Sequence, residues 1–115
     1  MNSSLVTTLA ETDLGGTEQL ARFFPDARPV GLSTLLALKR GGSVSVREAV
    51  VVDYAGAERA IFASALPLEF DDLIQLEDNR GQKIEAKVIA VQYQQGKTAV
   101  AVQILSGQFS WIKRP

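Results

Sequence analysis

Hydrophobic and polar positions alternate most regularly in the last third of the chain. Two β-type runs, Ile84–Tyr93 and Thr98–Leu105, are joined by a short connection that contains Gly96, which is typical of a β-hairpin. Successive side chains of a strand point to opposite faces. We therefore predict that Val100, Val102 and Ile104 face a core, while Ala99, Ala101 and Gln103 face away from it.

Shorter β-type runs come before this hairpin. They lie at 33–38, 44–52, 59–65 and 73–77, and turn residues follow two of them at 53–56 and 78–81. Five or six short strands at regular spacing, with little helix between them, predict a mainly β fold. We expect an antiparallel β-barrel, because closing a small sheet removes its exposed edges.

The first part of the chain has a different pattern. Leu20, Phe23 and Phe24 recur at helical spacing, with Thr17 placed to cap the helix and Pro25 just after it. We predict one or two short helices near the N-terminus, the first at 17–24. Residues 1–31 are then an N-terminal extension that contributes little to the barrel, and residues 32–115 form the barrel.

Length and charge limit the number of domains and the kinds of partner that we expect. The chain has 115 residues, 46% of them hydrophobic, and a net charge of −1, which suits one domain with one core. Nearly balanced charge gives no overall attraction to nucleic acid or to anionic membranes. Residues 1–10 lack the features of a signal peptide, and no run approaches a membrane span. We expect a cytoplasmic protein that neither inserts into membranes nor binds nucleic acid.

Candidate chemistry is scarce. The chain has no cysteine and no histidine, so thiolate and imidazole metal sites and Ser-His or Cys-His catalysis are excluded. The acidic positions 69, 71, 72, 77 and 78 do not have EF-hand spacing and are interpreted as a solvated turn face. The segment Lys39–Gly42 could hold a phosphate but lacks a P-loop pattern. We predict no enzyme activity, no catalytic residue, no metal and no cofactor.

Aromatic residues gather at the end of the sequence. Phe109, Trp111 and Ile112 follow the last strong strand and precede Lys113 and Arg114. One interpretation is that they plug an end of the barrel. The other is that they form a partner-binding patch, because tryptophan and phenylalanine are common interface anchors.

Residues 33–112 resemble the PilZ family, small six-stranded β-barrels of bacterial proteins that respond to cyclic di-GMP. The resemblance lies in the order of Ile84–Tyr93, the connection at Gly96, the strand Val100–Leu105 and the aromatic pair of Phe109–Trp111. The segment Leu66–Leu76 also resembles the family, because a leucine and a proline are followed by a polar turn and then by a strand. The resemblance implies a PilZ-like barrel in bacterial surface, motility or signalling machinery.

The nucleotide signature of that family is degenerate in this chain. The family holds its ligand with an Arg-x-x-x-Arg pair and an Asp/Asn-x-Ser-x-x-Gly turn. Here the turn keeps Asp53 but has Ala55 at the serine and Glu58 at the glycine position, and no two arginines stand four apart. A glutamate near the phosphates would repel them.

Two functions remain open at this stage. The leading one is a regulatory or protein-interaction module that does not bind cyclic di-GMP in the usual way, and whose partner is another protein or a second copy in a homodimer. The alternative is a cyclic di-GMP sensor that uses a rearranged set of Arg40, Arg47 and Asp53.

Overall fold

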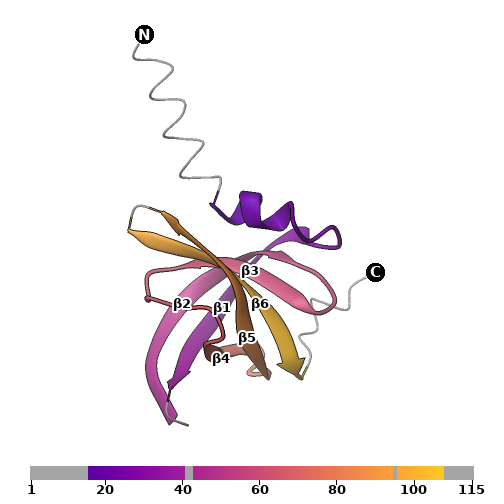
Figure 1. Ribbon diagram of the computed structural model, residues 1–115. Helices are drawn as coiled ribbons and strands as arrows, with labels where there is room; N and C mark the ends of the chain where they lie inside the picture. The colour runs from indigo at the N-terminus through magenta and orange to yellow at the C-terminus, as the bar shows by residue number, and fades with distance from the viewer. Residues whose placement is uncertain (1–15, 41–42, 95, 108–115) are drawn as a thin grey trace.

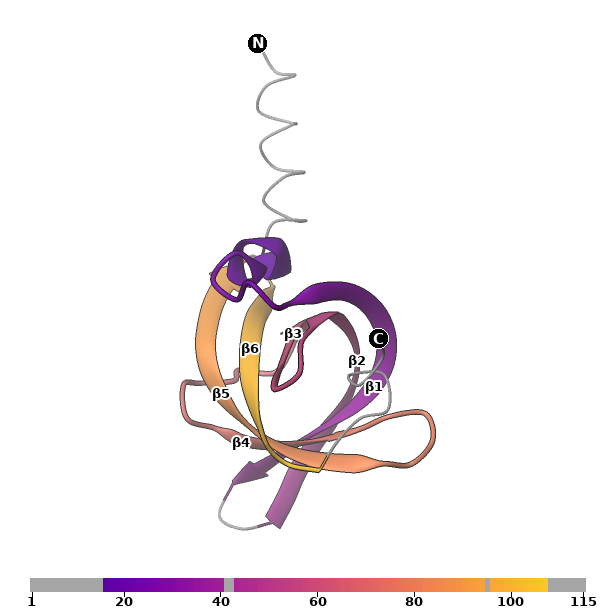
Figure 2. The same cartoon turned by 90° about the vertical axis from the view of Figure 1, so that its right-hand side faces the viewer.

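Six antiparallel strands close into a barrel in the computed structural model, which describes residues 16–40, 43–94 and 96–107. Figure 1 shows the barrel from the side, and Figure 2 shows the strands as a ring. The strands are β1 (Arg28–Arg40), β2 (Ser43–Ala55), β3 (Arg59–Ser64), β4 (Leu73–Glu77), β5 (Lys83–Gln94) and β6 (Lys97–Ser106). A short helix at 16–21 precedes them. The predicted fold class is confirmed.

The predicted strands agree with the structure to within one residue at each end for β3, β4, β5 and β6. β1 and β2 are longer than predicted, with 13 residues each. β1 begins at Arg28, inside the segment assigned to the extension. The turn predicted at 53–56 begins later than predicted, because β2 continues to Ala55. A β-bulge allows this, since Val52 and Tyr54 pair with consecutive residues of β3 and Asp53 is the extra residue.

The order of strands around the barrel is β1-β2-β3-β6-β5-β4, with β4 paired to β1. β6, the last strand in sequence, therefore lies between β3 and β5. β4 has only five residues and pairs with β1 from Leu35 to Lys39. The part of β1 before Leu35 therefore has β2 on one side and no strand of the described chain on the other.

The interior of the barrel is a single apolar core. Val100 and Val102 are 0% exposed, and the partly buried Ile104 packs against the same cluster, so the predicted inward face of the last strand is confirmed. The largest completely buried side chains are Phe62, Leu36, Ile61, Leu68, Ile74, Leu76 and Ile84. All but Ile61 and Leu68 come from the inward-facing positions of strands, and Leu68 enters from the loop before β4.

A second apolar cluster lies outside the barrel wall, beneath residues 16–27, which we term the N-terminal cap. Leu20 of the cap packs with Ile61, Ala99 and Ala101 on the outer face of β3 and β6. Figure 2 shows the cap lying over β5 and β6. Both faces of β6 are therefore buried here. The expectation that only one face of this strand is core is wrong, and the described part of the N-terminal segment, residues 16–27, packs on the barrel rather than standing apart from it.

Polar contacts hold the cap against the end of β2, the start of β3 and β5. Thr17 Oγ1 donates a hydrogen bond to Asp53 Oδ2 at 3.0 Å, and Gln92 Nε2 donates to Gln19 Oε1. The Arg59 guanidinium lies 5.2 Å from the ring centre of Phe24, an arrangement that favours cation–π attraction. The part of the chain that the structure describes contains no helix with the length and apolar character needed to cross a bilayer.

Candidate functional site

Asp53, one of the three predicted ligand residues, lies at the β2 bulge. The bulge directs it toward the N-terminal cap, where its carboxylate accepts the hydrogen bond from Thr17. A shallow pocket opens at this point, which we term the Asp53 pocket. Its lining residues are Thr17, Glu18, Pro29, Val30, Gly31, Asp53 and Tyr54. The pocket has two carboxylates in its lining and neither a lysine nor an arginine.

The structure does not bring the predicted ligand residues together. Arg47 is exposed on β2, six positions before Asp53 on the same strand, a separation of roughly 20 Å at the rise of an extended strand. Arg40 ends β1, and its side chain lies outside the described residues. Lys39, beside it, is engaged by an ion pair, since its Nζ lies 2.7 Å from Glu85 Oε2.

The predicted partner-binding residues Phe109, Trp111 and Ile112 lie outside the described residues, so whether they plug the barrel or form a patch stays a prediction. The last described position is Gly107, which follows β6 with a φ of 84°. It lies close to β5: a Cβ added there would be 2.9 Å from Ile84 Cγ2 and 2.9 Å from the Lys83 carbonyl oxygen.

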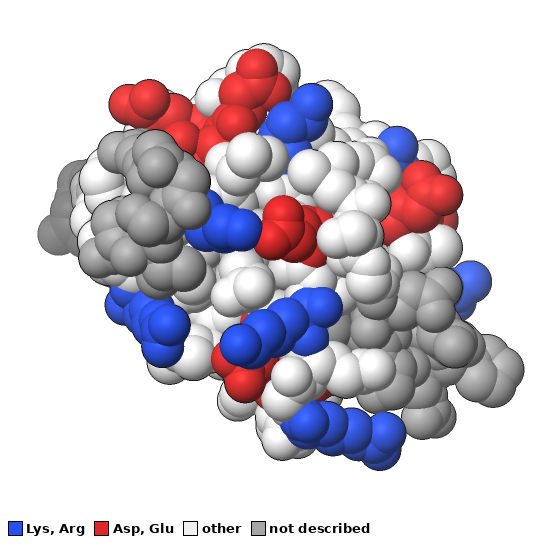
Figure 3. All heavy atoms as spheres, turned by 90° about the horizontal axis from the view of Figure 1, so that it is seen from below, with Lys and Arg blue, Asp and Glu red and all other residues white. Residues whose placement is uncertain are grey.

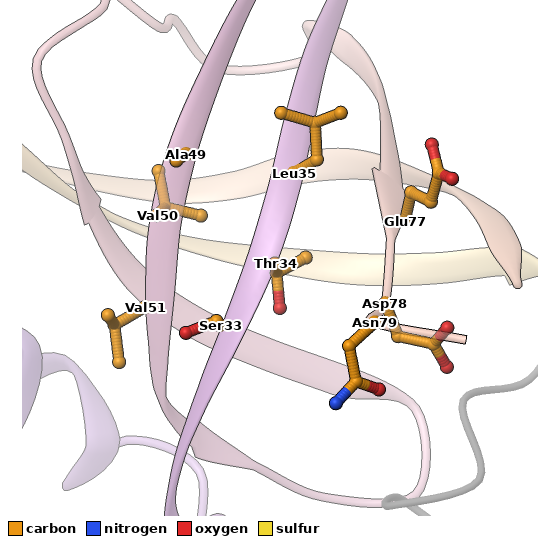
Figure 4. Close-up of a pocket in the computed structure, with 9 residues that line it drawn as sticks. All are labelled: Ser33, Thr34, Leu35, Ala49, Val50, Val51, Glu77, Asp78 and Asn79. Atoms are coloured by element: carbon orange, nitrogen blue, oxygen red, sulfur yellow. The ribbon is translucent and has the colours of Figure 1, made fainter. Parts of the chain in front are cut away.

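A second concave surface lies on the outside of β1 and β2, and we term it the β1–β2 groove. Its lining residues are Ser33, Thr34, Leu35, Ala49, Val50, Val51, Glu77, Asp78 and Asn79. Figure 4 shows β1 between β2 and the end of β4 at this place. Leu35 and Val51 are 36% and 49% exposed, and Ala49, opposite Leu35, is also exposed. Apolar side chains thus line a concave surface that water can reach.

The groove exists because β4 is short and diverges from β1 after Glu77. Leu35 pairs with Glu77, and the chain then turns away through Asp78 and Asn79. Asp78 is buried, and its Oδ1 accepts hydrogen bonds from the backbone N–H groups of Arg80 and Gln82. This carboxylate stabilises the turn, whereas Glu77 remains half-buried at the rim of the groove.

One acidic residue of the β3–β4 loop, Asp72, also stabilises the backbone. Asp72 Oδ2 accepts a hydrogen bond from the Glu69 N–H at 2.8 Å. Within the described ranges, no three Asp or Glu side chains converge as a metal site would require. Seen from below, the surface carries both signs of charge interspersed, as Figure 3 shows.

Sequence reasoning missed the groove and the role of Thr17. Val50, Val51 and Val52 form one β-branched run, and nothing in such a run distinguishes the exposed middle residue from its buried neighbours. The run Thr34-Leu35-Leu36 is also ambiguous, because the polar Thr34 is buried together with Leu36, whereas Leu35 between them is exposed. An exposed Leu35 and Val51 could have been found only from the strand register.

Comparisons with protein-family models, with curated proteins and with solved structures found no match for this chain.

Proposed function

We propose that this chain is a non-enzymatic, PilZ-like module that regulates a protein by binding it, and that it does not bind cyclic di-GMP in the usual way. The observation that carries the proposal is the lining of the two concave surfaces on β1 and β2. Apolar residues and carboxylates line both, and neither has a lysine or arginine in its lining. Such surfaces suit a protein partner better than a ligand with two phosphates.

The surroundings of Asp53 support the second half of the proposal. Its carboxylate already accepts a hydrogen bond from Thr17, and Glu18 adds a second negative charge to the pocket lining. Arginine holds phosphates and guanine faces through bidentate hydrogen bonds and stacking. The nearest arginine of the predicted set with a described side chain, Arg47, is too far along β2 to act with Asp53 on one nucleotide.

The composition supports a binding role rather than catalysis. With no histidine and no cysteine, the chain lacks the side chains that most often serve as general bases or nucleophiles near neutral pH. The resemblance to PilZ proteins supports a role for such a module in bacterial surface, motility or signalling machinery. On this proposal its partner is another protein in the cytoplasm or a second copy of the chain.

Isothermal titration of the full chain with cyclic di-GMP tests the nucleotide part of the proposal. We expect no saturable heat. Micromolar or tighter binding that is lost in Arg40→Ala or Arg47→Ala would overturn the proposal and establish the sensor alternative. A Lys97→Ala variant, changed at an exposed cation outside both pockets, serves as the control for a general loss of positive charge.

A further inference from the structure

We infer that the N-terminal cap is a lid, which undocks as a unit from an intact barrel and uncovers an apolar surface on the outside of β3 and β6. We term this surface the β3–β6 face and define it by Ile61, Ala99 and Ala101, which pack with Leu20 of the cap and are at most 1% exposed. The inference goes beyond the proposed function, because it concerns a surface that the docked chain hides.

The barrel does not depend on the cap for its closure. Each of the six strands is hydrogen-bonded to a strand on both sides along at least part of its length. The described core cluster inside the barrel contains no residue of the cap, and Leu20 packs on the wall from outside. The barrel therefore keeps its strand pairing and its core when the cap leaves.

The main-chain hydrogen bonds of the cap stay within it. For example, the Ala27 N–H donates to the Phe24 carbonyl oxygen at 2.9 Å. Over the described chain, no main-chain hydrogen bond joins the cap to a strand, and the hydrogen bonds that do cross involve the side chains of Thr17 and Gln19. The cap can therefore leave as one unit, with its own hydrogen bonds intact.

The contacts that hold the cap on the barrel are few, and an unpaired donor partly offsets them. Leu20 is buried, whereas Phe24 is only partly buried. The ion pair of Arg59 with Asp26, at 3.7 Å, joins side chains that are 34% and 50% exposed, and such pairs contribute little. Nε of Arg59 is buried without a hydrogen-bond partner in the described ranges, a cost that hydration relieves on undocking. Undocking therefore requires less free energy than global unfolding.

Undocking changes the surfaces that the chain presents. It exposes the β3–β6 face, where Ala101 lies opposite Ile61 of β3 and opposite Ala90 of β5. It also removes Thr17 and Glu18 from the lining of the Asp53 pocket. Contiguous apolar surface of this kind is where proteins associate. The docked cap is thus an autoinhibitory cover, because it keeps this surface from other proteins.

Cysteine labelling tests the inference, because the chain has no cysteine of its own. Ala101 and Val102 are neighbours on β6 with 0% exposure, the first against the cap and the second inside the barrel. Ala101→Cys and Val102→Cys are made separately in the full chain. Their reaction with the thiol reagent DTNB is timed in native buffer and in low urea, and each rate is divided by that of the same variant unfolded in urea.

We expect Ala101→Cys to react about tenfold faster than Val102→Cys or more, and to be accelerated less by urea, because local opening exposes less surface than global unfolding. Equal rates with equal urea dependence would overturn the inference, since the cap would then leave only when the barrel unfolds. Reaction of Ala101→Cys at the rate of the unfolded chain would overturn it as well, since the cap would not be docked.

Two changes in the cap identify the opening as its own. Adding Leu20→Ala removes the packing that closes the cap, and we expect Ala101→Cys to react about tenfold faster or more. Adding Phe23→Ala, at an exposed residue of the same cap, should leave the rate unchanged. If Ala101→Cys does not fold, Ala99→Cys at the next outward position of β6 is the reporter, with the same results expected. An unchanged rate with Leu20→Ala would overturn the inference.

Discussion

Replacing Leu20 with alanine removes the side chain through which the N-terminal cap packs on the barrel. Leu20 is 5% exposed and lies against Ile61, Ala99 and Ala101. Buried Leu→Ala changes cost about 2–5 kcal/mol of unfolding free energy. We expect about 2–3 kcal/mol here, because the site lies outside the barrel wall and two of its partners are alanines with few atoms to contact.

Alanine has a higher helix propensity than leucine, so the substitution does not weaken the helix at residues 16–21 itself. Any loss of unfolding free energy must therefore come from the lost packing. For a domain of this size, 2–3 kcal/mol corresponds to a decrease in melting temperature on the order of 10 °C. Thermal and urea unfolding followed by circular dichroism measure it. Phe23→Ala is the control: Phe23 is 75% exposed, and we expect a change within about 0.5 kcal/mol.

Equal melting of Leu20→Ala and wild type would refute the reasoning, since it would mean that the cap contributes no packing energy to the barrel. A loss in Phe23→Ala as large as that in Leu20→Ala would refute it differently, by showing that the faces of the helix are assigned wrongly. Only the first result would return the cap to the status of an appendage.

Three further predictions concern other parts of the chain. Val102→Asp places an unpaired charge in the core, where Val102 is 0% exposed, and we expect a loss of several kcal/mol and an unfolded protein by circular dichroism. Gly107→Ala should destabilise the protein more than Gly31→Ala in urea unfolding: both have positive φ, but only at Gly107 would a Cβ meet the backbone of β5. Phe109→Ala and Trp111→Ala, made separately, should show whether the last residues are a plug or a patch. A loss of melting temperature alone favours the plug, and a change in size on gel filtration favours the patch.

The hairpin of β5 and β6 could be predicted from sequence because its hydrophobic pattern and its turn residues both indicate a hairpin. Two alternating runs are separated by a connection with Gly96, whose φ of 76° is the left-handed conformation that glycine adopts without strain. The end of β4 could be predicted equally well, because Asp78 and Gly81 mark a turn directly after it. In both places the local sequence alone determines the element.

The rest depends on contacts between distant parts of the chain. Ala99 and Ala101 are small and carry no signal of burial, yet they are covered because Leu20 lies over them. The bulge at Asp53 is visible only as a shift in register between β2 and β3. The exposure of Leu35 and Val51 results from the strand register, which directs their side chains to the outer face of β1 and β2. The candidate site therefore could not be predicted from sequence.

The position of β6 between β3 and β5 has a consequence for biosynthesis. A nascent chain that has not yet extended beyond β5 can form at most an open sheet in the order β3-β2-β1-β4-β5, which leaves the edges of β3 and β5 unpaired. Such edges recruit other strands and promote aggregation. Residues 97–106 remove both edges at once when they insert. The barrel thus can close only after β6 has emerged from the ribosome.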